Sequence, residues 1–169
     1  MVTSLNILYS SSSVRRILGI AQSVNVRVQQ FAFVVWVHVA GQRPTFISKI
    51  VFRVHFVAWR KAQANGLTAT QWLDKATRFT VRNESKGSAY AIDASPTQLV
   101  CTCEDYRNQI QFLGRGCCKH GYAVLNKLGF DSLAKYIEAY RPTGFLRDPR
   151  YARPRSPNSM TEIKQLTPA

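Results

Sequence analysis

Apolar and polar residues alternate in three short runs in the middle of the chain. In RFTVRN, Phe79 and Val81 alternate with polar side chains, which is typical of a half-buried strand. SAYAID repeats the pattern with Tyr90 and Ile92, and TQLVC forms the third run. The segments NESKG and DASP between these runs are rich in turn formers. The pattern therefore predicts a three-stranded antiparallel meander.

After the third run the spacing of apolar residues changes to that of a helix. EDYRNQIQFLG suits one or two helical turns. CKHGYAVLNKLG places Tyr122, Leu125 and Leu128 on one side of a helix that ends at Gly129. A third helix is predicted in DSLAKYIEAY, with Asp131 as its cap. We expect an α+β fold in which a small antiparallel meander is followed by helices.

The segment before the meander is harder to assign. Thr68 and Gln71 have the spacing of a capping box, which predicts a short helix over residues 69–77. Further upstream, FAFVVWVHVA and FISKIVFRVHFVAW are apolar runs rich in β-branched and aromatic residues, as strands are.

Composition divides the 169 residues into three zones. Residues 59–141 are the predicted domain, with its core at 78–128. Residues 142–169 are rich in Pro and Arg and are expected to form a basic, disordered tail. Residues 1–58 are an uncertain N-terminal extension.

Two hypotheses apply to that extension. Its apolar runs could be strands of folded protein. Alternatively, the start codon is misassigned, because no Met occurs between Met1 and Met160 and the zone holds no acidic residue. A true start at a non-Met codon near Val57 would leave the predicted domain intact.

The net charge of +14 is unevenly spread. Residues 1–73 hold eight Lys and Arg and no carboxylate, since the first acid is Asp74. Residues 74–140 hold nine bases and seven acids, and the remainder holds six bases and two acids. The basic excess therefore lies in the flanks. Such flanks could contact DNA or another anionic surface, or could simply be solvated.

Other function classes find little support in the sequence. No run approaches the ~18 consecutive apolar residues of a membrane span, so we expect a cytoplasmic protein with no membrane partner. There is no Walker loop and no pair of acids at a suggestive spacing. We therefore do not expect an enzyme or a small-molecule substrate.

All four cysteines lie within residues 101–125, together with one of the three histidines. Cys101, Cys103, Cys118 and His120 form the pattern C-x-C-x14-C-x-H. Two pairs of soft or borderline donors on two elements suit the tetrahedral coordination of zinc, and four protein ligands close a structural site. A disulfide or a Cys118–His120 nucleophile pair fits this spacing less well.

The pattern resembles the SWIM-type zinc finger, whose signature is C-x-C, a variable loop and C-x-H. Cys117 stands where family members commonly carry Pro. The signature puts zinc on Cys118, although a C-x2-H pair of Cys117 with His120 stays open, as does a redox role for the Cys117 thiol. The residues that carry the resemblance are Cys101, Cys103, Asp105, Tyr106, Cys118, Lys119, His120, Ala123, Val124 and Leu125.

The resemblance implies a ββα arrangement around one structural zinc ion and a role in binding. SWIM-like domains occur in helicase-associated and transposase-related proteins, with DNA-binding or protein–protein roles. The first hypothesis is a zinc-binding, nucleic-acid-binding module that uses its basic flanks. The alternative is a protein–protein adaptor with a helicase or transposase component as partner.

Some neighbouring residues carry two interpretations. Asp105 either supports His120 or the backbone of a ligand, or simply occupies the start of a helix, where a carboxylate is favourable. We expect Trp72, Tyr90 and Tyr122 in the core, and His38 and His55 as packing residues rather than metal ligands.

Overall fold

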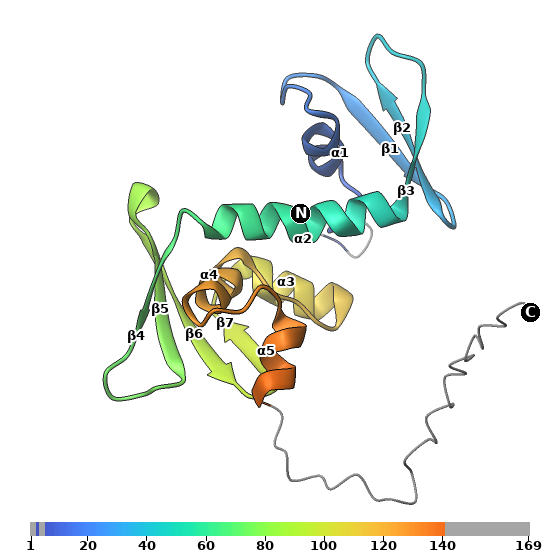
Figure 1. Cartoon of the computed structure of the whole chain (residues 1–169). Coiled ribbons are helices and arrows are strands. Elements are labelled where there is room, and N and C mark those ends of the chain that lie inside the picture. The colour runs from blue at the N-terminus through green and yellow to red at the C-terminus, as the bar shows by residue number, and fades with distance from the viewer. Residues whose placement is uncertain (1–2, 4–5, 141–169) are drawn as a thin grey trace, which may run out of the picture.

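The computed structural model of the chain describes residue 3 and residues 6–140. These residues form a three-stranded and a four-stranded antiparallel sheet and five α-helices (Figure 1). The α+β class predicted from the sequence is confirmed. One long helix, α2 (Lys49–Ala64), lies between the two sheets.

Residues 6–48 form what we call the N-terminal lobe. The strands pair in the order β1-β2-β3, and α1 packs on β1. All valines of β1 and β2 except Val34 point to the side of the sheet that packs on α1 and on Phe52 of α2. This lobe thus has a core of its own. Its elements are α1 (Ser11–Leu18), β1 (Val26–Gln30), β2 (Val34–Val39) and β3 (Thr45–Ser48).

Helix α2 corrects one sequence prediction. FAFVVWVHVA does contain strand β2, but in FISKIVFRVHFVAW only the first residues are strand and the rest is α2. Ser48 caps the helix, because its hydroxyl accepts the N–H of Ile50 at 3.3 Å. Phe52, Arg60 and Ala64 are buried, and their separations of eight and four residues place them on one broad side of the helix. Burial of that face outweighs the β propensity of the valines.

Residues 68–140 form the C-terminal lobe. Its sheet has the order β4-β5-β6-β7, so the three predicted strands are present and a fourth precedes them. The helix predicted over residues 69–77 is wrong, because Thr68 to Gln71 pair with β5 instead. The strands are β4 (Thr68–Gln71), β5 (Arg78–Asn83), β6 (Ser88–Ser95) and β7 (Gln98–Cys101), with a 3-10 turn at Glu84–Lys86.

The three predicted helices of this lobe are present as α3 (Glu104–Leu113), α4 (Lys119–Lys127) and α5 (Leu133–Tyr140). Helix α4 lies between α2 and the four-stranded sheet (Figure 1). The cap predicted for the last helix is wrong. The Ser132 hydroxyl accepts the N–H of Lys135, whereas the Asp131 carboxylate accepts from the Lys135 ammonium at 2.6 Å.

The predicted domain boundary between residues 58 and 59 falls inside α2. The predicted tail, residues 142–169, lies outside the described residues. Within the part of the chain that the structure describes, no helix has the length and apolar character needed to cross a bilayer.

Candidate metal centre

Strand register places the first donor of the candidate centre. Cys101 pairs with Ile92 of β6, and Ile92 pairs with Phe79 of β5. Residues directly opposite each other in an antiparallel sheet share a face, so all three point to the buried side, where α4 packs. Cys101 is 3% exposed as a result.

The second and third donors are helix caps. Cys103 precedes α3, and its sulfur accepts the N–H of Tyr106 at 3.4 Å. Cys118 precedes α4, and its sulfur accepts the N–H of Gly121 at 3.5 Å. These N–H groups belong to the unpaired first turns of the helices and favour a negative sulfur.

The fourth donor, His120, lies in the first turn of α4 and is 4% exposed. Its Nδ1 atom lies 3.8 Å from the Cys101 sulfur and 3.8 Å from the Cys118 sulfur. The structure therefore brings all four predicted ligands together. The donor atoms of Cys101, Cys103, Cys118 and His120 lie within 4.8 Å of one another, and all four residues are buried.

These separations fit one tetrahedral ion. Zn–S bonds of about 2.3 Å and Zn–N bonds of about 2.0–2.1 Å place sulfur and nitrogen about 3.6 Å apart around a shared centre. The donor set of three sulfurs and one imidazole is also one that soft or borderline metals prefer. The cluster could hold a metal ion, and its four ligands would leave no open position on a tetrahedral ion.

Three thiols this close cannot all ionise without a cation among them. A hydrogen bond to the Cys103 sulfur raises the pKa of Cys101 to about 12, and the same bond lowers the pKa of Cys103. Hydrogen bonds to Cys101 and Cys103 raise the pKa of Cys118. Negative charge on one of these sulfurs therefore opposes ionisation of the others. A bound cation would allow all three to become thiolates.

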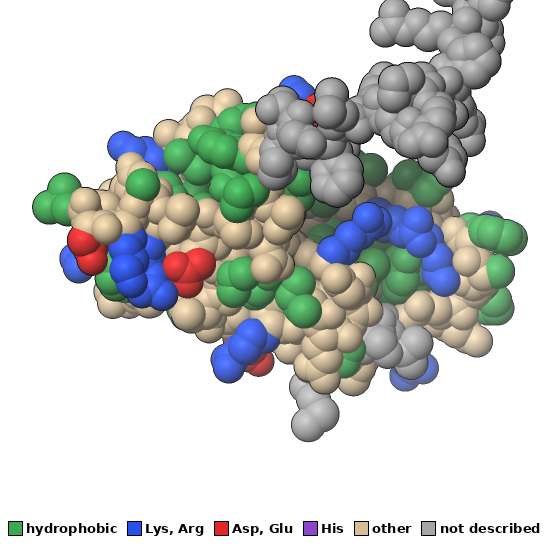
Figure 2. All heavy atoms as spheres, turned by 90° about the horizontal axis from the view of Figure 1, so that it is seen from below, with side chains coloured by type: hydrophobic (Ala, Val, Ile, Leu, Met, Phe, Trp, Pro, Cys, Tyr) green, Lys and Arg blue, Asp and Glu red, His purple; other side chains and the backbone are tan. Residues whose placement is uncertain are grey.

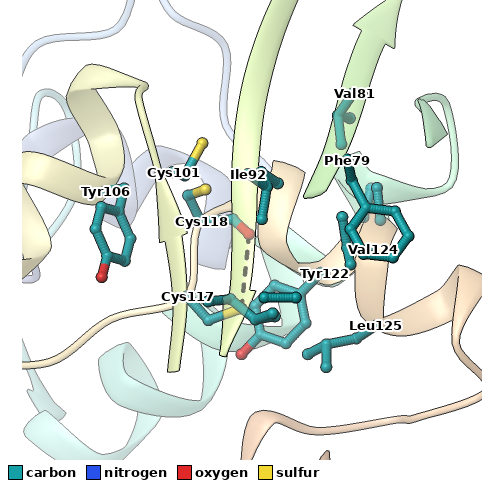
Figure 3. Packing of buried hydrophobic residues seen from close by; sticks show 14 of the residues in the cluster. Phe79, Val81, Ile92, Cys101, Tyr106, Cys117, Cys118, Tyr122, Val124 and Leu125 are labelled. Atoms are coloured by element: carbon teal, nitrogen blue, oxygen red, sulfur yellow. Dashed lines mark hydrogen bonds between the residues drawn. The ribbon is translucent and has the colours of Figure 1, made fainter. Parts of the chain in front are cut away.

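Cys117 lies outside the cluster. Figure 3 shows its side chain turned toward Tyr122, apart from the Cys101 and Cys118 sulfurs. It is 8% exposed, and burial raises the pKa of its thiol to about 12. This placement argues against the pairing of Cys117 with His120 and against a reactive thiol, which needs exposure and a low pKa.

A chain of hydrogen bonds holds the backbone next to Cys118. Arg60 of α2 donates to both carboxylate oxygens of Asp105, at 3.0 and 2.6 Å. Asp105 also accepts from the Gln109 amide at 3.0 Å, and the Gln109 carbonyl accepts the N–H of Cys117 at 3.0 Å. The long helix is thereby tied to the loop that carries Cys118.

This chain of hydrogen bonds combines the two interpretations of Asp105. Its carboxylate lies in the first turn of α3, as the second interpretation expected. It also supports the backbone beside a candidate ligand, as the first interpretation allowed, because it binds Gln109, which accepts the N–H of Cys117. Its side-chain partners are Arg60 and Gln109 rather than His120. Sequence reasoning missed Arg60 and Gln109. Arg60 lies eight residues after Phe52 and four before Ala64, and this helical spacing was the sequence signal that could have placed Arg60 on a buried side of a helix.

The expected core aromatics have different outcomes. Tyr122 is buried, whereas Trp72 is 38% exposed. Tyr90 is half-buried and stacks on the His120 ring. Neither His38 nor His55 belongs to a metal-binding group in the described part of the chain, and both are half-buried.

Comparisons with protein-family models, with curated proteins and with solved structures find no match for this chain.

Proposed function

We propose that the chain is a zinc-stabilised module that binds nucleic acid. The observation that supports zinc binding is that three buried cysteine sulfurs and a ring nitrogen of His120 lie within 4.8 Å of one another. Zinc is the ion of choice for such a Cys3His set, and a closed site of this kind is structural. The spacing C-x-C-x14-C-x-H, which resembles that of SWIM-type fingers, supports the same proposal.

Zinc would stabilise the C-terminal lobe by joining parts distant in the sequence. Cys101 ends β7, Cys103 caps α3, and Cys118 and His120 begin α4. One ion would thus tie the sheet to two helices. Structural zinc sites in small domains contribute about 10–16 kcal/mol of apparent binding free energy, and this becomes folding free energy.

The charge of the N-terminal lobe supports a polyanionic partner. The lobe, residues 6–48, contains four arginines and no carboxylate, so these cations have no acidic neighbour within their own lobe. Among the described residues, every ion pair lies at residue 60 or beyond. Figure 2 shows Lys and Arg side chains distributed over one face of the molecule, with hydrophobic side chains between them. Phosphate backbones are attracted to such surfaces.

A protein–protein adaptor is the second candidate, and exposed apolar side chains favour it. On α2, Ile50 is 67% exposed and Val54 is 63% exposed. Phe33, in the turn between β1 and β2, is 85% exposed. Large exposed apolar groups close together are typical of protein interfaces.

Titration of labelled oligonucleotides over a series of salt concentrations tests the proposal. Binding through phosphate contacts should weaken steeply as salt rises, because counterions are released from the nucleic acid. Removal of zinc with a chelator should unfold the C-terminal lobe. Absence of binding at low salt would overturn the nucleic-acid proposal and favour the adaptor, whose apolar contacts would vary little with salt.

A further inference from the structure

The three-stranded sheet of the N-terminal lobe has one face that points away from the valine core of the lobe. We call it the outer face. Register places Arg27 opposite His38, Gln29 opposite Trp36, and Trp36 opposite Phe46. The core valines of β1 and β2 alternate with these residues and point to the other side, whereas Val34 lies on the side of Trp36 and His38. The outer face therefore carries Arg27, Gln29, Trp36, His38 and Phe46.

This face has the wrong composition for a simple solvated surface. Antiparallel sheets with one solvated side usually place polar side chains there. Here Phe46 is 62% exposed, and Trp36 and His38, both half-buried, lie with ring centroids 5.8 Å apart and planes 31° apart. Phe31, 46% exposed, contacts Phe46 edge-to-face at 6.1 Å. The rings form a row across neighbouring strands.

No described helix covers the row of rings. Helix α1 packs on β1 and α2 packs on β3, and both belong to the valine side, where Val14 and Phe52 join the core. In Figure 1, α1 lies against one face of this sheet and the opposite face has no helix over it.

The charges around the outer face are all positive. Arg27 lies on the face itself, and Arg43 lies in the turn between β2 and β3; both are exposed. Since residues 1–73 hold no carboxylate, no acid of this lobe neutralises them. An uncompensated positive field around exposed and half-buried rings complements a ligand that presents both phosphates and flat bases.

We propose that the outer face binds single-stranded nucleic acid. Bases stack on Phe46 and Trp36, and phosphates contact Arg27 and Arg43. A single strand is required because the bases of a duplex are stacked on one another and their flat faces are covered. This inference rests on the proposed nucleic-acid function, but it assigns the contact to a face that carries none of the candidate zinc ligands.

Fluorescence anisotropy with labelled oligothymidylate, oligouridylate and a DNA duplex tests the assignment. The Phe46→Ala and Trp36→Ala variants should bind each single strand about tenfold or more weakly than the wild-type chain, because each loses a stacking surface. The matched control is Trp72→Ala, which removes an exposed aromatic residue from the C-terminal lobe and should leave binding unchanged. The two single strands show whether DNA, RNA or both are bound.

A second readout does not depend on removing a ring. In a chain with Trp59→Phe and Trp72→Phe, Trp36 is the remaining tryptophan, and stacking of a base should quench its fluorescence on titration. Thermal unfolding verifies that each variant is folded. The assignment is overturned if folded Phe46→Ala and Trp36→Ala variants bind like the wild type, and the proposed function then stands with another contact surface. If the wild-type chain binds no nucleic acid at all, both fail.

Discussion

The Tyr90 ring lies stacked on the His120 imidazole, with ring centroids 4.3 Å apart and planes 30° apart. Tyr90 comes from β6 and His120 from α4, so the sheet fixes the orientation of a donor carried by the helix. Hydrogen-bonded partners that orient a metal-binding histidine typically contribute 10- to 100-fold to metal affinity, and a stacked ring restrains the same imidazole through packing. Tyr90→Leu should therefore weaken zinc binding about tenfold, as measured by competition with a chromophoric chelator.

The matched control is Tyr90→Phe, which keeps the ring and should keep the affinity. If the Leu variant binds zinc as tightly as the Phe variant, the stacked ring does not orient His120.

The Arg60–Asp105 ion pair joins α2 to α3 and is unequally buried. The Arg60 side chain is 10% exposed and that of Asp105 is 37% exposed. Asp105→Ala should destabilise the protein by roughly 2 kcal/mol, because it leaves a buried guanidinium without its carboxylate. Urea denaturation measures the loss.

The double variant Arg60→Met with Asp105→Ala, compared with the two single variants, separates the cost of an unpaired buried charge from the cost of lost packing. It leaves no buried charge unpaired, so its loss of unfolding free energy should be smaller than the sum of the losses in the two single variants. Strictly additive losses would show that the ion pair is energetically unimportant.

Gly116 lies against Gln109, the residue that holds the backbone of Cys117. A Cβ at residue 116 would meet the Gln109 Cβ at 2.4 Å and its Oε1 at 2.6 Å. Because Gln109 is only 1% exposed, its side chain is packed on all sides and cannot move away from an added Cβ. Gly116→Ala should cost about 1–3 kcal/mol through overpacking, as measured by thermal unfolding.

Gly66→Ala is the control for that change. A Cβ at residue 66 would meet nothing within 4 Å, and its φ angle lies outside the left-handed region. This variant should be neutral or slightly more stable. Equal stability of the two Ala variants would contradict the packing argument.

The donor cluster was accessible from sequence because its spacing is local. One residue between two donors, at the end of a strand or the start of a helix, limits the directions in which both can point. The partners Tyr90 and Arg60 were not accessible in that way. Tyr90 reaches His120 through the pairing of β6 with β7 and the packing of α4, and Arg60 reaches Asp105 from 45 residues away.

Two of the secondary-structure predictions were wrong for related reasons. The Thr68 to Gln71 spacing fits a helix start, but the same residues form β4 because β5 offers an edge to pair with. The β-branched residues of α2 suggest a strand locally, and only the burial of Phe52 and Arg60 on one face selects the helix. Contacts distant in the sequence decided both segments.

Cys117 should be chemically inert in the native protein. It is buried, and its thiol has a pKa raised to about 12 by that burial, so little thiolate is present at neutral pH. Iodoacetamide treatment of the folded protein at pH 8, followed by peptide mass spectrometry, should leave Cys117 unmodified. Rapid modification of Cys117 before unfolding would contradict its placement and would revive the redox hypothesis.

The central claim is that Cys101, Cys103, Cys118 and His120 hold a structural zinc ion. Metal content by inductively coupled plasma mass spectrometry tests it most directly, on the wild-type chain and on Cys118→Ser and Cys117→Ser variants. The account predicts a single zinc ion per wild-type chain, lost together with cooperative unfolding in Cys118→Ser and kept in Cys117→Ser. Freshly reduced, folded wild-type protein without zinc would contradict it.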